Sequence, residues 1–381
     1  MRIIRTIHPV GQGAFYTEKF ICENGDQKLV VYDCGAKSND YKYLTVELSS
    51  YFHKAQFIDL LFVSHFDDDH INGIIQLKKL GIKIKTVVVP LIDQNNRWFY
   101  ICTGGALVMG AINNPKSFFG ADNLIEVESV NENILNENDE NSKEIDIEGI
   151  DDKIKSGNHM LLSGLKQHWY YIPYNFEEDK RRNELVTELK NNDYFVNAAK
   201  DMDCTVEDLL HNDKFIEGNS SIINSIYKGI CTDGANRCSL VVYSGPTKKK
   251  DNPARFCYCE NHNYWCRFGL IGCGCLYLGD TDLNQGRRPN KIIRQLELFL
   301  KHCISEIGTI QLPHHGAIKN FNKSLLSYNK NYKLFFASFG NGNTYGHPSY
   351  DVVEQIISSD NIFCGVNENR GSGLIEYIRL G

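Results

Sequence analysis

The sequence predicts an α/β fold, in which helices pack against β-sheets, and three observations support this class. Residues 57–63 and 83–89 are short apolar runs with the length and composition of buried strands. Residues 71–80, between them, have the apolar pattern of a helix, and this strand–helix–strand order is typical of a sheet covered by helices. The chain of 381 residues is 42% hydrophobic and 23% charged, which is enough to bury a large core.

Composition and charge argue against several classes of protein. No stretch approaches the roughly 20 consecutive apolar residues of a membrane span, and residues 1–5 lack the apolar segment of a signal peptide. We therefore expect a cytoplasmic protein without membrane contact. An odd number of cysteines, 13, without a secretion signal favours reduced thiols. The net charge of −6 argues against a protein that coats nucleic acid non-specifically.

The first elements are predicted to be strands. Residues 3–37 have the pattern of a meander with a turn at 23–26, and Asp33 lies near the end of its last strand. A carboxylate at a strand end is usually a turn or cap residue, so the pattern alone favours a structural role for Asp33.

The loop after the strand at 57–63 carries the strongest chemical signal. It reads Ser-His-Phe-Asp-Asp-Asp-His, and its candidate metal ligands are His65, Asp67, Asp69 and His70. Imidazole combined with carboxylate suits Zn²⁺, Mn²⁺ or Fe. Three carboxylates crowded together with two imidazoles would repel one another unless cations neutralised their charge. The alternative is a solvated acidic loop, which has no need of histidine at both ends.

Residues 93–235 are expected to be an insertion in a single domain, whose core comprises residues 1–92 and 236–381. Within it, residues 126–152 are rich in Asn, Glu, Asp and Ser, which is typical of a mobile loop, and residues 177–228 predict two or three helices. We interpret the insertion as a lid that selects substrate or as a contact surface for a protein partner. A purely structural decoration fits the pattern equally well.

Three predicted strands in the C-terminal part end in side chains that can bind metal or substrate. These are Asp280, the pair His314 and His315, and, in the loop after the last strand, His347. Each signal is weak by itself, because an aspartate or a histidine at a strand end is usually a turn residue. Their order along the chain, after the His-Asp loop at 64–70, is what indicates a shared site.

Two further helices are predicted at 291–302 and 350–358 from their apolar spacing. Arg287 and Arg288 precede the first of them and are candidates for binding phosphate oxygens. Solvated charge at a helix start is the equally good alternative.

Taken together, the motifs resemble those of the metallo-β-lactamase fold. The loop at 64–70 is similar to its His-x-His-x-Asp-His signature, with Asp67 in place of the second histidine. That variant, with Pro-His-His-Gly at 313–316 and Asn-Thr-Tyr-Gly-His-Pro at 343–348, is similar to the metallo-β-lactamase-like domain of ComEC-type DNA-uptake proteins and their free-standing relatives. Ala317 stands where that group usually has serine.

The resemblance covers residues 3–90 and 236–378 and implies a four-layer αββα sandwich with a helical insertion and two divalent metal ions, Zn²⁺ or Mn²⁺. It implies one ion held by His65, Asp67 and Asp280, and another held by Asp69, His70, Asp280 and either His314 or His315. It also implies that Asp33 supports the metal loop and that His347 binds or protonates the leaving oxygen of the substrate.

The resemblance implies a hydrolase, with Asp69, Asp280 and His347 as its catalytic residues. We expect a two-metal phosphodiesterase or nuclease that acts on DNA or RNA, since a phosphodiester held by metal ions needs no globally basic surface. Three alternatives remain. They are a cyclic-nucleotide phosphodiesterase, a hydrolase of thioesters, lactones or β-lactams, and a non-catalytic, metal-stabilised subunit of a larger assembly such as a defence complex.

A cysteine-rich stretch precedes the strand that ends at Asp280. Its Cys257, Cys259, His262 and Cys266 form a Cys₃His set of the kind that Zn²⁺ binds tetrahedrally. However, the Cys-x-Cys spacing is tighter than usual, and strand alternation would place Cys257 and Cys259 on one face for simple packing as well. Structural zinc and plain packing both remain open.

Overall fold

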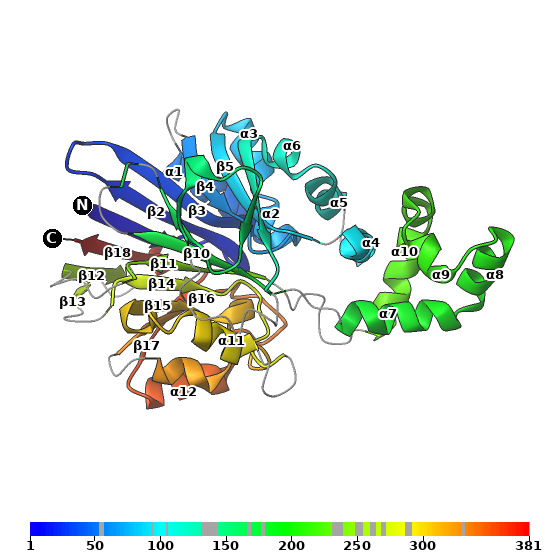
Figure 1. Cartoon of the computed structure of the whole chain (residues 1–381). Helices are drawn as coiled ribbons and strands as arrows, with labels where there is room; N and C mark the ends of the chain where they lie inside the picture. Colours follow the sequence, from blue (N-terminus) through cyan, green and yellow to red (C-terminus); the bar gives the residue numbers. More distant parts are fainter. Residues whose placement is uncertain are drawn as a thin grey trace.

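The computed structural model describes residues 1–52, 57–92, 94–103, 106–130, 143–162, 164–165, 169–176, 180–230, 239–247, 254–259, 264–267, 272–285, 292–328 and 332–380. Within these ranges, two mixed sheets pack face to face and helices cover both outer faces (Figure 1). The predicted α/β class and the four-layer αββα arrangement are thus confirmed.

The first sheet comprises β1 (Arg2–Ile7), β2 (Gly13–Ile21), β3 (Gln27–Ala36), β4 (Phe57–Phe62), β5 (Lys83–Pro90), β6 (Ala121–Glu128), β8 (Lys153–Lys155), β12 (Ala254–Cys259), β13 (Tyr264–Arg267) and β18 (Leu374–Arg379). Their order is β13-β12-β18-β1-β2-β3-β4-β5-β6-β8. Strands β1 to β3 are antiparallel, as the predicted meander requires, and β3, β4, β5, β6 and β8 are parallel.

The second sheet comprises β7 (Glu144–Asp146), β9 (His159–Leu161), β10 (Tyr170–Asn175), β11 (Leu240–Gly245), β14 (Gly274–Tyr277), β15 (Ile307–Gln311), β16 (Leu334–Ser338) and β17 (Ile362–Val366). Their order is β17-β16-β15-β14-β11-β10-β9-β7. Because β14 to β17 are parallel, their carboxyl ends meet at one edge of the sheet.

Helices complete the outer layers. The first sheet is covered by α1 (Tyr41–Tyr51), α3 (Ile74–Lys79) and α6 (Pro115–Phe119), and the second by α11 (Ile292–Phe299) and α12 (Tyr350–Ser358) (Figure 1). Short 3-10 helices are η3 (Ile147–Gly149), η5 (Ile304–Glu306), η6 (Pro313–Gly316), η7 (Lys323–Ser327) and η8 (Arg370–Ser372). Among the described residues, no helix is both long and apolar enough to cross a membrane.

The apolar runs that the sequence shows are buried on both faces. In β3 and β4, Val31 and Leu61 belong to the core beneath the helices, whereas Val30 and Leu60 belong to the core between the sheets. A third core lies between the second sheet and its helices. Strands covered on both sides have no polar face, which explains why these runs are continuously apolar.

The helix predicted at 71–80 is divided into α2 (Asp68–Ile71) and α3. The break lies at Asn72 and Gly73. The Asn72 amide donates a hydrogen bond to the carbonyl oxygen of Ala36, and a Cβ on Gly73 would lie 2.4 Å from Sγ of Cys34. The chain therefore packs against the end of β3 at this point, and the contact fixes the position of the preceding loop at 64–70.

Residues 93–235 do not form one separate unit. Strands β6 to β10 lie within this range and complete both sheets. The mobile loop expected at 126–152 instead includes the end of β6, β7 and η3, because Val127 and Ile147 bury their side chains between the sheets. Residues 131–142 lie outside the described part of the chain.

The remainder of that range is helical, with α4 (Gln94–Thr103), α5 (Ala106–Asn113), α7 (Lys180–Asn191), α8 (Asp193–Asp201), α9 (Val206–Leu210) and α10 (Asp213–Ile230). Helices α7 to α10 stand beside the sandwich, next to α4 (Figure 1). The rings of Phe99 on α4 and Tyr227 on α10 meet edge to face, with centroids 5.3 Å apart.

A network of buried charges joins the strands near the chain termini. Glu376 on β18 accepts hydrogen bonds from Nη1 of Arg5, at 2.7 Å, and from Nε of Arg255, at 2.9 Å. Arg5 also donates to Glu18, at 2.7 Å. All four side chains are buried, and the two cations are balanced by the two carboxylates. Such a network is costly to break, because removal of one partner leaves an uncompensated buried charge.

Candidate metal centre

The candidate ligands gather where four loops meet. The loop after β4 carries His65 and Asp67, and the short helix α2 that follows carries Asp69 and His70. The loops after β14, β15 and β16 carry Asp280, the His314–His315 pair and His347. These segments are far apart in the sequence, and the facing edges of the two sheets bring them together. Gly279 permits the approach, since its φ is +51° and a Cβ there would lie 2.8 Å from Cβ of Ser239.

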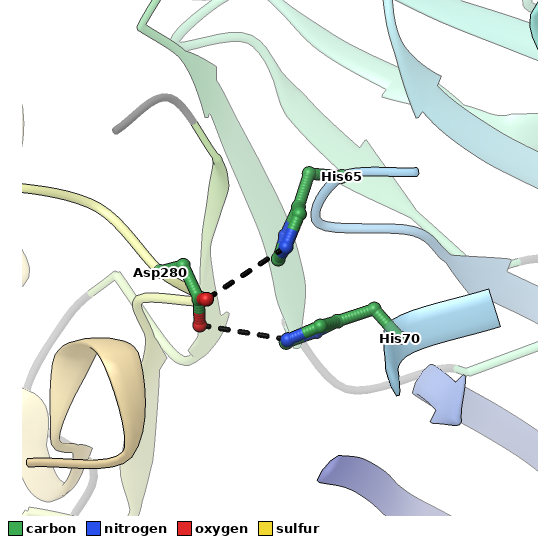
Figure 2. A group of neighbouring side chains, drawn as sticks. All are labelled: His65, His70 and Asp280. Atoms are coloured by element: carbon green, nitrogen blue, oxygen red, sulfur yellow. Dashed lines mark ion pairs between the residues drawn. The ribbon is translucent and has the colours of Figure 1, made fainter. Parts of the chain in front are cut away.

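Asp280 lies at the centre of this cluster. Its Oδ2 is 3.8 Å from Nε2 of His65 and 3.8 Å from Nδ1 of His314, and its Oδ1 is 3.5 Å from Nε2 of His70. Figure 2 shows His65, from the loop after β4, and His70, from α2, facing the two oxygens of Asp280. The carboxylate is therefore positioned to contact two cations at once.

Two groups of side chains have the spacing of metal ligands. One is His65, His70 and Asp280, and the other is Asp69, His70 and His315; within each group the ligand atoms lie within 4.8 Å of one another. In the second group, Nε2 of His315 is 3.6 Å from Oδ2 of Asp69. All five residues are buried.

The second nitrogen of each imidazole is held by a hydrogen bond. Nδ1 of His70 donates to Oδ2 of Asp33, at 2.8 Å, and Nδ1 of His315 donates to the carbonyl oxygen of Ser338, at 2.8 Å. Nδ1 of His65 lies 2.9 Å from Oγ of Ser64, whose own proton goes to Asp33. All three rings are thereby fixed as the tautomer that presents the lone pair of Nε2 to the cluster, which is how metal-binding histidines are oriented.

The ligand atoms themselves have no hydrogen-bond partner among the described residues. They are Nε2 of His65, His70 and His315, Nδ1 of His314 and Oδ1 of Asp280. Buried polar atoms without partners are rare because each costs free energy, so their convergence on one point calls for a cation. The residues therefore fit divalent metal ions, and the mixture of imidazole and carboxylate suits Zn²⁺ or Mn²⁺.

His65 and Asp280 have the ionisation that metal binding requires. Burial alone would lower the pKa of His70, but the carboxylates of Asp280 and Asp33 raise it well above its usual value. Burial, and then the neighbouring His70, lower the pKa of His65 to about 3, so this ring is neutral at pH 7. Burial alone would raise the pKa of Asp280, but the charges of His314 and His70 hold it well below its usual range. Neutral imidazole and ionised carboxylate are the forms that bind metal.

Asp67 is less closely placed than the resemblance implies. It is only partly buried and belongs to neither of the two tight groups. Burial, and then the charge of Asp69, raise the pKa of Asp67 to about 7. The Asp67 carboxyl is thus close enough to Asp69 for the two charges to interact, and Nδ1 of His314 lies 3.8 Å from Oδ2 of Asp280.

The backbone at His314 and His315 is unusual. Both residues have positive φ, +48° and +56°, in the region that normally favours glycine. Asp33 shares this property, with φ of +55°. Three non-glycine residues in left-handed conformation at one site indicate that the fold holds these side chains in place at the expense of local strain.

His347 lies at the edge of the cluster. Its ring is 5.6 Å from that of His314, and its Nδ1 is buried without a hydrogen-bond partner among the described residues. Burial, and then the neighbouring His314 and His315, lower the pKa of His347 to about 4. The neutral ring is therefore the dominant form at pH 7.

Lys37 is part of the site, and no motif in the sequence points to it. Its Nζ lies 3.1 Å from Oδ1 of Asp69, and its side chain is 44% exposed. A lysine after a strand is usually a surface residue, so no pattern singles it out. Ser64 and Ser239 are further additions: Oγ of Ser239 accepts the backbone N–H of Asp280 and lies 3.3 Å from Nδ1 of His65.

Two sets of predicted residues are not placed in the site. Arg287 and Arg288 lie outside the described residues. Of the proposed zinc ligands, Cys257 is buried, and its Sγ lies 3.4 Å from the Glu376 carboxylate in the buried network. It pairs across the strands with Cys266. His262 and the side chains of Cys259 and Cys266 lie outside the described part, so the zinc prediction stays a prediction.

Comparison with known proteins adds one finding. No protein-family model matches the chain, and no curated protein sequence matches it significantly. Among solved structures, the chain is similar to the short form of human tRNase Z, with 10% sequence identity and a TM-score of 0.33, over 82% of this chain and 77% of that chain. A likeness of this degree carries no argument about function, which therefore rests on the site and its motifs.

Proposed function

We propose that this protein is a metal-dependent hydrolase, and more narrowly a two-metal phosphodiesterase that cleaves nucleic acid. The observation that carries the proposal is the convergence of partnerless histidine nitrogens on both oxygens of Asp280. A carboxylate placed in this way can bridge two ions, which is the arrangement that two-metal hydrolases use. The resemblance of the loops to those of ComEC-type domains supports the narrower proposal.

The ligands divide into two sets that share Asp280. His65 and His314 face its Oδ2 and would hold one ion, with Asp67 nearby. His70 faces its Oδ1 and, with Asp69 and His315, would hold the other. When bound, the ions would lower the pKa of a water molecule and polarise the bond that is attacked.

The charge of this centre favours an anionic substrate. Two dications outweigh the carboxylates of Asp69, Asp280 and Asp67, and Lys37 adds a further positive charge at the rim. A phosphodiester carries a negative charge, whereas a lactam or a lactone does not. An excess of positive charge therefore stabilises a phosphodiester and the additional charge that develops when it is attacked.

The side chains around the ions would position the substrate. Lys37, half-exposed and fixed by Asp69, can contact a phosphate oxygen without leaving its ion pair, because an ammonium group has three donors. His347 is neutral at pH 7, since its pKa is lowered to about 4, and would donate a hydrogen bond to the leaving oxygen.

An activity panel tests the proposal. Single-stranded and duplex DNA, RNA, cyclic nucleotides, a thioester and a β-lactam are each incubated with protein loaded with Mn²⁺ or Zn²⁺. We expect cleavage of nucleic acid, reduced at least tenfold in kcat/KM by Lys37→Met and less by Lys37→Arg, which keeps the charge. Hydrolysis of the lactam or the thioester without cleavage of any phosphodiester would contradict the proposal.

A further inference from the structure

An exposed tyrosine continues the line of rings that leads out of the metal centre. Tyr345 is 64% exposed, and its ring stacks on His347 with centroids 6.0 Å apart and an angle of 20° between the planes. The His347 ring in turn meets His314 edge to face, and Nδ1 of His314 lies 3.8 Å from Asp280. Two ring-to-ring steps therefore separate this surface aromatic from a metal-binding imidazole.

The loop that carries Tyr345 is held in place by its own hydrogen bonds. The Asn343 side chain donates to the carbonyl oxygens of Gly340, at 2.7 Å, and His347, at 2.8 Å, and accepts the backbone N–H of His347, at 3.1 Å. These three bonds close the loop at its base. The backbone that carries Tyr345 is thus held in place, which lowers the entropic cost of binding a ligand on its ring.

A single exposed aromatic side chain is common and by itself indicates nothing. Tyr332, 58% exposed, is such a case, because it precedes β16 at the end opposite to His315. Tyr345 differs in two respects: its ring stacks on His347, and His347 in turn contacts His314 of the metal cluster. A flat, ordered π-surface next to a phosphate-binding centre matches a nucleobase attached to that phosphate.

We propose that Tyr345 is a stacking platform for an unpaired nucleobase beside the scissile phosphodiester, so that the preferred substrate is single-stranded nucleic acid. This inference rests on the proposed function. Bases of any sequence have a π-face, and stacking on an aromatic side chain contributes to single-strand binding without sequence preference. In a duplex, both faces of an internal base are covered by its neighbours, so it must be unstacked before it can use the platform.

The test compares three substrates with the metal-loaded protein. They are a single-stranded oligonucleotide, the same strand with abasic residues flanking the cleaved bond, and a blunt duplex. Cleavage is followed by kcat and KM, and binding by fluorescence anisotropy of the labelled strands. The variants are Tyr345→Ala, Tyr345→Phe, which keeps the ring, and Tyr332→Ala as a matched control with an exposed tyrosine distant from the site.

We expect Tyr345→Ala to weaken binding and kcat/KM for the intact single strand by about 5- to 150-fold, the range for losing one stacked base, mainly through KM. Tyr345→Phe and Tyr332→Ala should resemble the wild type. The abasic strand should be cleaved equally by the wild type and Tyr345→Ala. An equal loss on the intact and abasic strands, or no loss on either, would overturn the inference.

The outcomes also separate this inference from the proposed function. The wild type could bind the single strand in a Tyr345-dependent manner and yet cleave no nucleic acid with either metal. The phosphodiesterase proposal would then fail, whereas the inference that Tyr345 stacks on an unpaired base would be retained. If the wild type cleaves nucleic acid but shows no dependence on Tyr345, the platform fails and the phosphodiesterase proposal stands. A protein that neither binds nor cleaves nucleic acid contradicts both.

Discussion

Oδ2 of Asp33 accepts a hydrogen bond from Nδ1 of His70 at 2.8 Å, while its Oδ1 accepts the backbone N–H of Ser64 at 2.6 Å. One carboxylate at the end of β3 therefore fixes both the backbone of the metal loop and the tautomer of a ligand within it. The side chain of Asp33 is fully buried, and its backbone φ is positive. This arrangement needs an acceptor at both oxygens, which distinguishes aspartate from its amide.

We expect Asp33→Asn to reduce metal affinity by roughly 10- to 100-fold, the usual effect of losing a residue that orients a ligand. An amide can accept from His70 or from Ser64, but its NH₂ group then faces the other donor. Metal affinity is measured by competition with a chromogenic chelator. Asp26→Asn, in the exposed turn before β3, is the matched control, and unchanged affinity in Asp33→Asn would contradict the assigned role.

Asp280→Asn tests the bridging carboxylate. The amide is a poorer ligand for two dications, so we expect turnover to be abolished and bound metal to fall to one ion per chain or less. Metal content is measured by mass spectrometry after desalting. Asp282→Asn, two residues along the same loop, should retain both ions. Two ions and full activity in Asp280→Asn would exclude this role.

His347→Ala should retain metal near the wild-type level and lose roughly 10²–10³-fold in kcat, the range for one preorganised hydrogen-bond donor. The pKa of His347 is lowered to about 4 by burial and by His314 and His315, and bound dications would lower it further. If the reaction required the protonated form of His347, kcat would fall as the pH rises through 4. If neutral His347 is the hydrogen-bond donor, its titration does not affect kcat above about pH 5.

The pH–rate profile from pH 5 to 8 distinguishes these forms. A descending limb between pH 6 and 8 that disappears in His347→Ala would contradict the neutral donor, and loss of metal would make His347 a ligand. His211→Ala, after α9 in the helices beside the sandwich, provides the control for loss of a histidine.

Glu376→Gln should destabilise the fold by about 3–5 kcal/mol, because two buried guanidinium groups lose a carboxylate partner. Urea unfolding at pH 7 measures the change. Glu148→Gln, which removes an exposed ion pair with Lys85, should have no measurable effect. Equal stability of Glu376→Gln and the wild type would show that the network is neutral in energy.

The same residue predicts acid sensitivity. Burial alone would raise the pKa of Glu376, but Arg255 and Arg5 lower it to about 2. An unfolded glutamate titrates near 4.3, so as the pH falls the unfolded chain binds this proton first. The contribution of Glu376 to stability is therefore fully present above about pH 4.3 and is lost as the pH falls toward 2. In Glu376→Gln, this part of the pH dependence should be absent.

The sequence was sufficient for the core of the fold and for most of the cluster. The run at 57–63 and its His-Asp loop are contiguous, so one window of sequence contained a strand and four candidate ligands. Asp280, His314 and His315 lie at the ends of strands that parallel pairing brings to the same edge. The closeness of these residues follows from the order of the strands in the sheet, and the order of the motifs in the sequence indicated that strand order.

Other parts could not be predicted because they depend on contacts across the fold. Strands β7, β8 and β9 have three residues each, too few to show a period, and they form only by pairing with longer strands. Lys37 and Ser239 act through the positions of Asp69 and Asp280, which no local pattern contains. The absence of Asp67 from both groups of ligand atoms likewise depends on how the loop turns after His65.

The left-handed turn at His314 and His315 has a consequence for the history of this sequence. Each of these conformations costs an L-residue about 1–2 kcal/mol, which glycine or asparagine would largely avoid. As long as the imidazoles hold a metal, natural selection tolerates the cost. A descendant that had abandoned this chemistry would gain stability by substituting glycine or asparagine at both positions. The residues that homologous sequences have at positions 314 and 315 should therefore distinguish those that have retained a working centre from those that have become inactive.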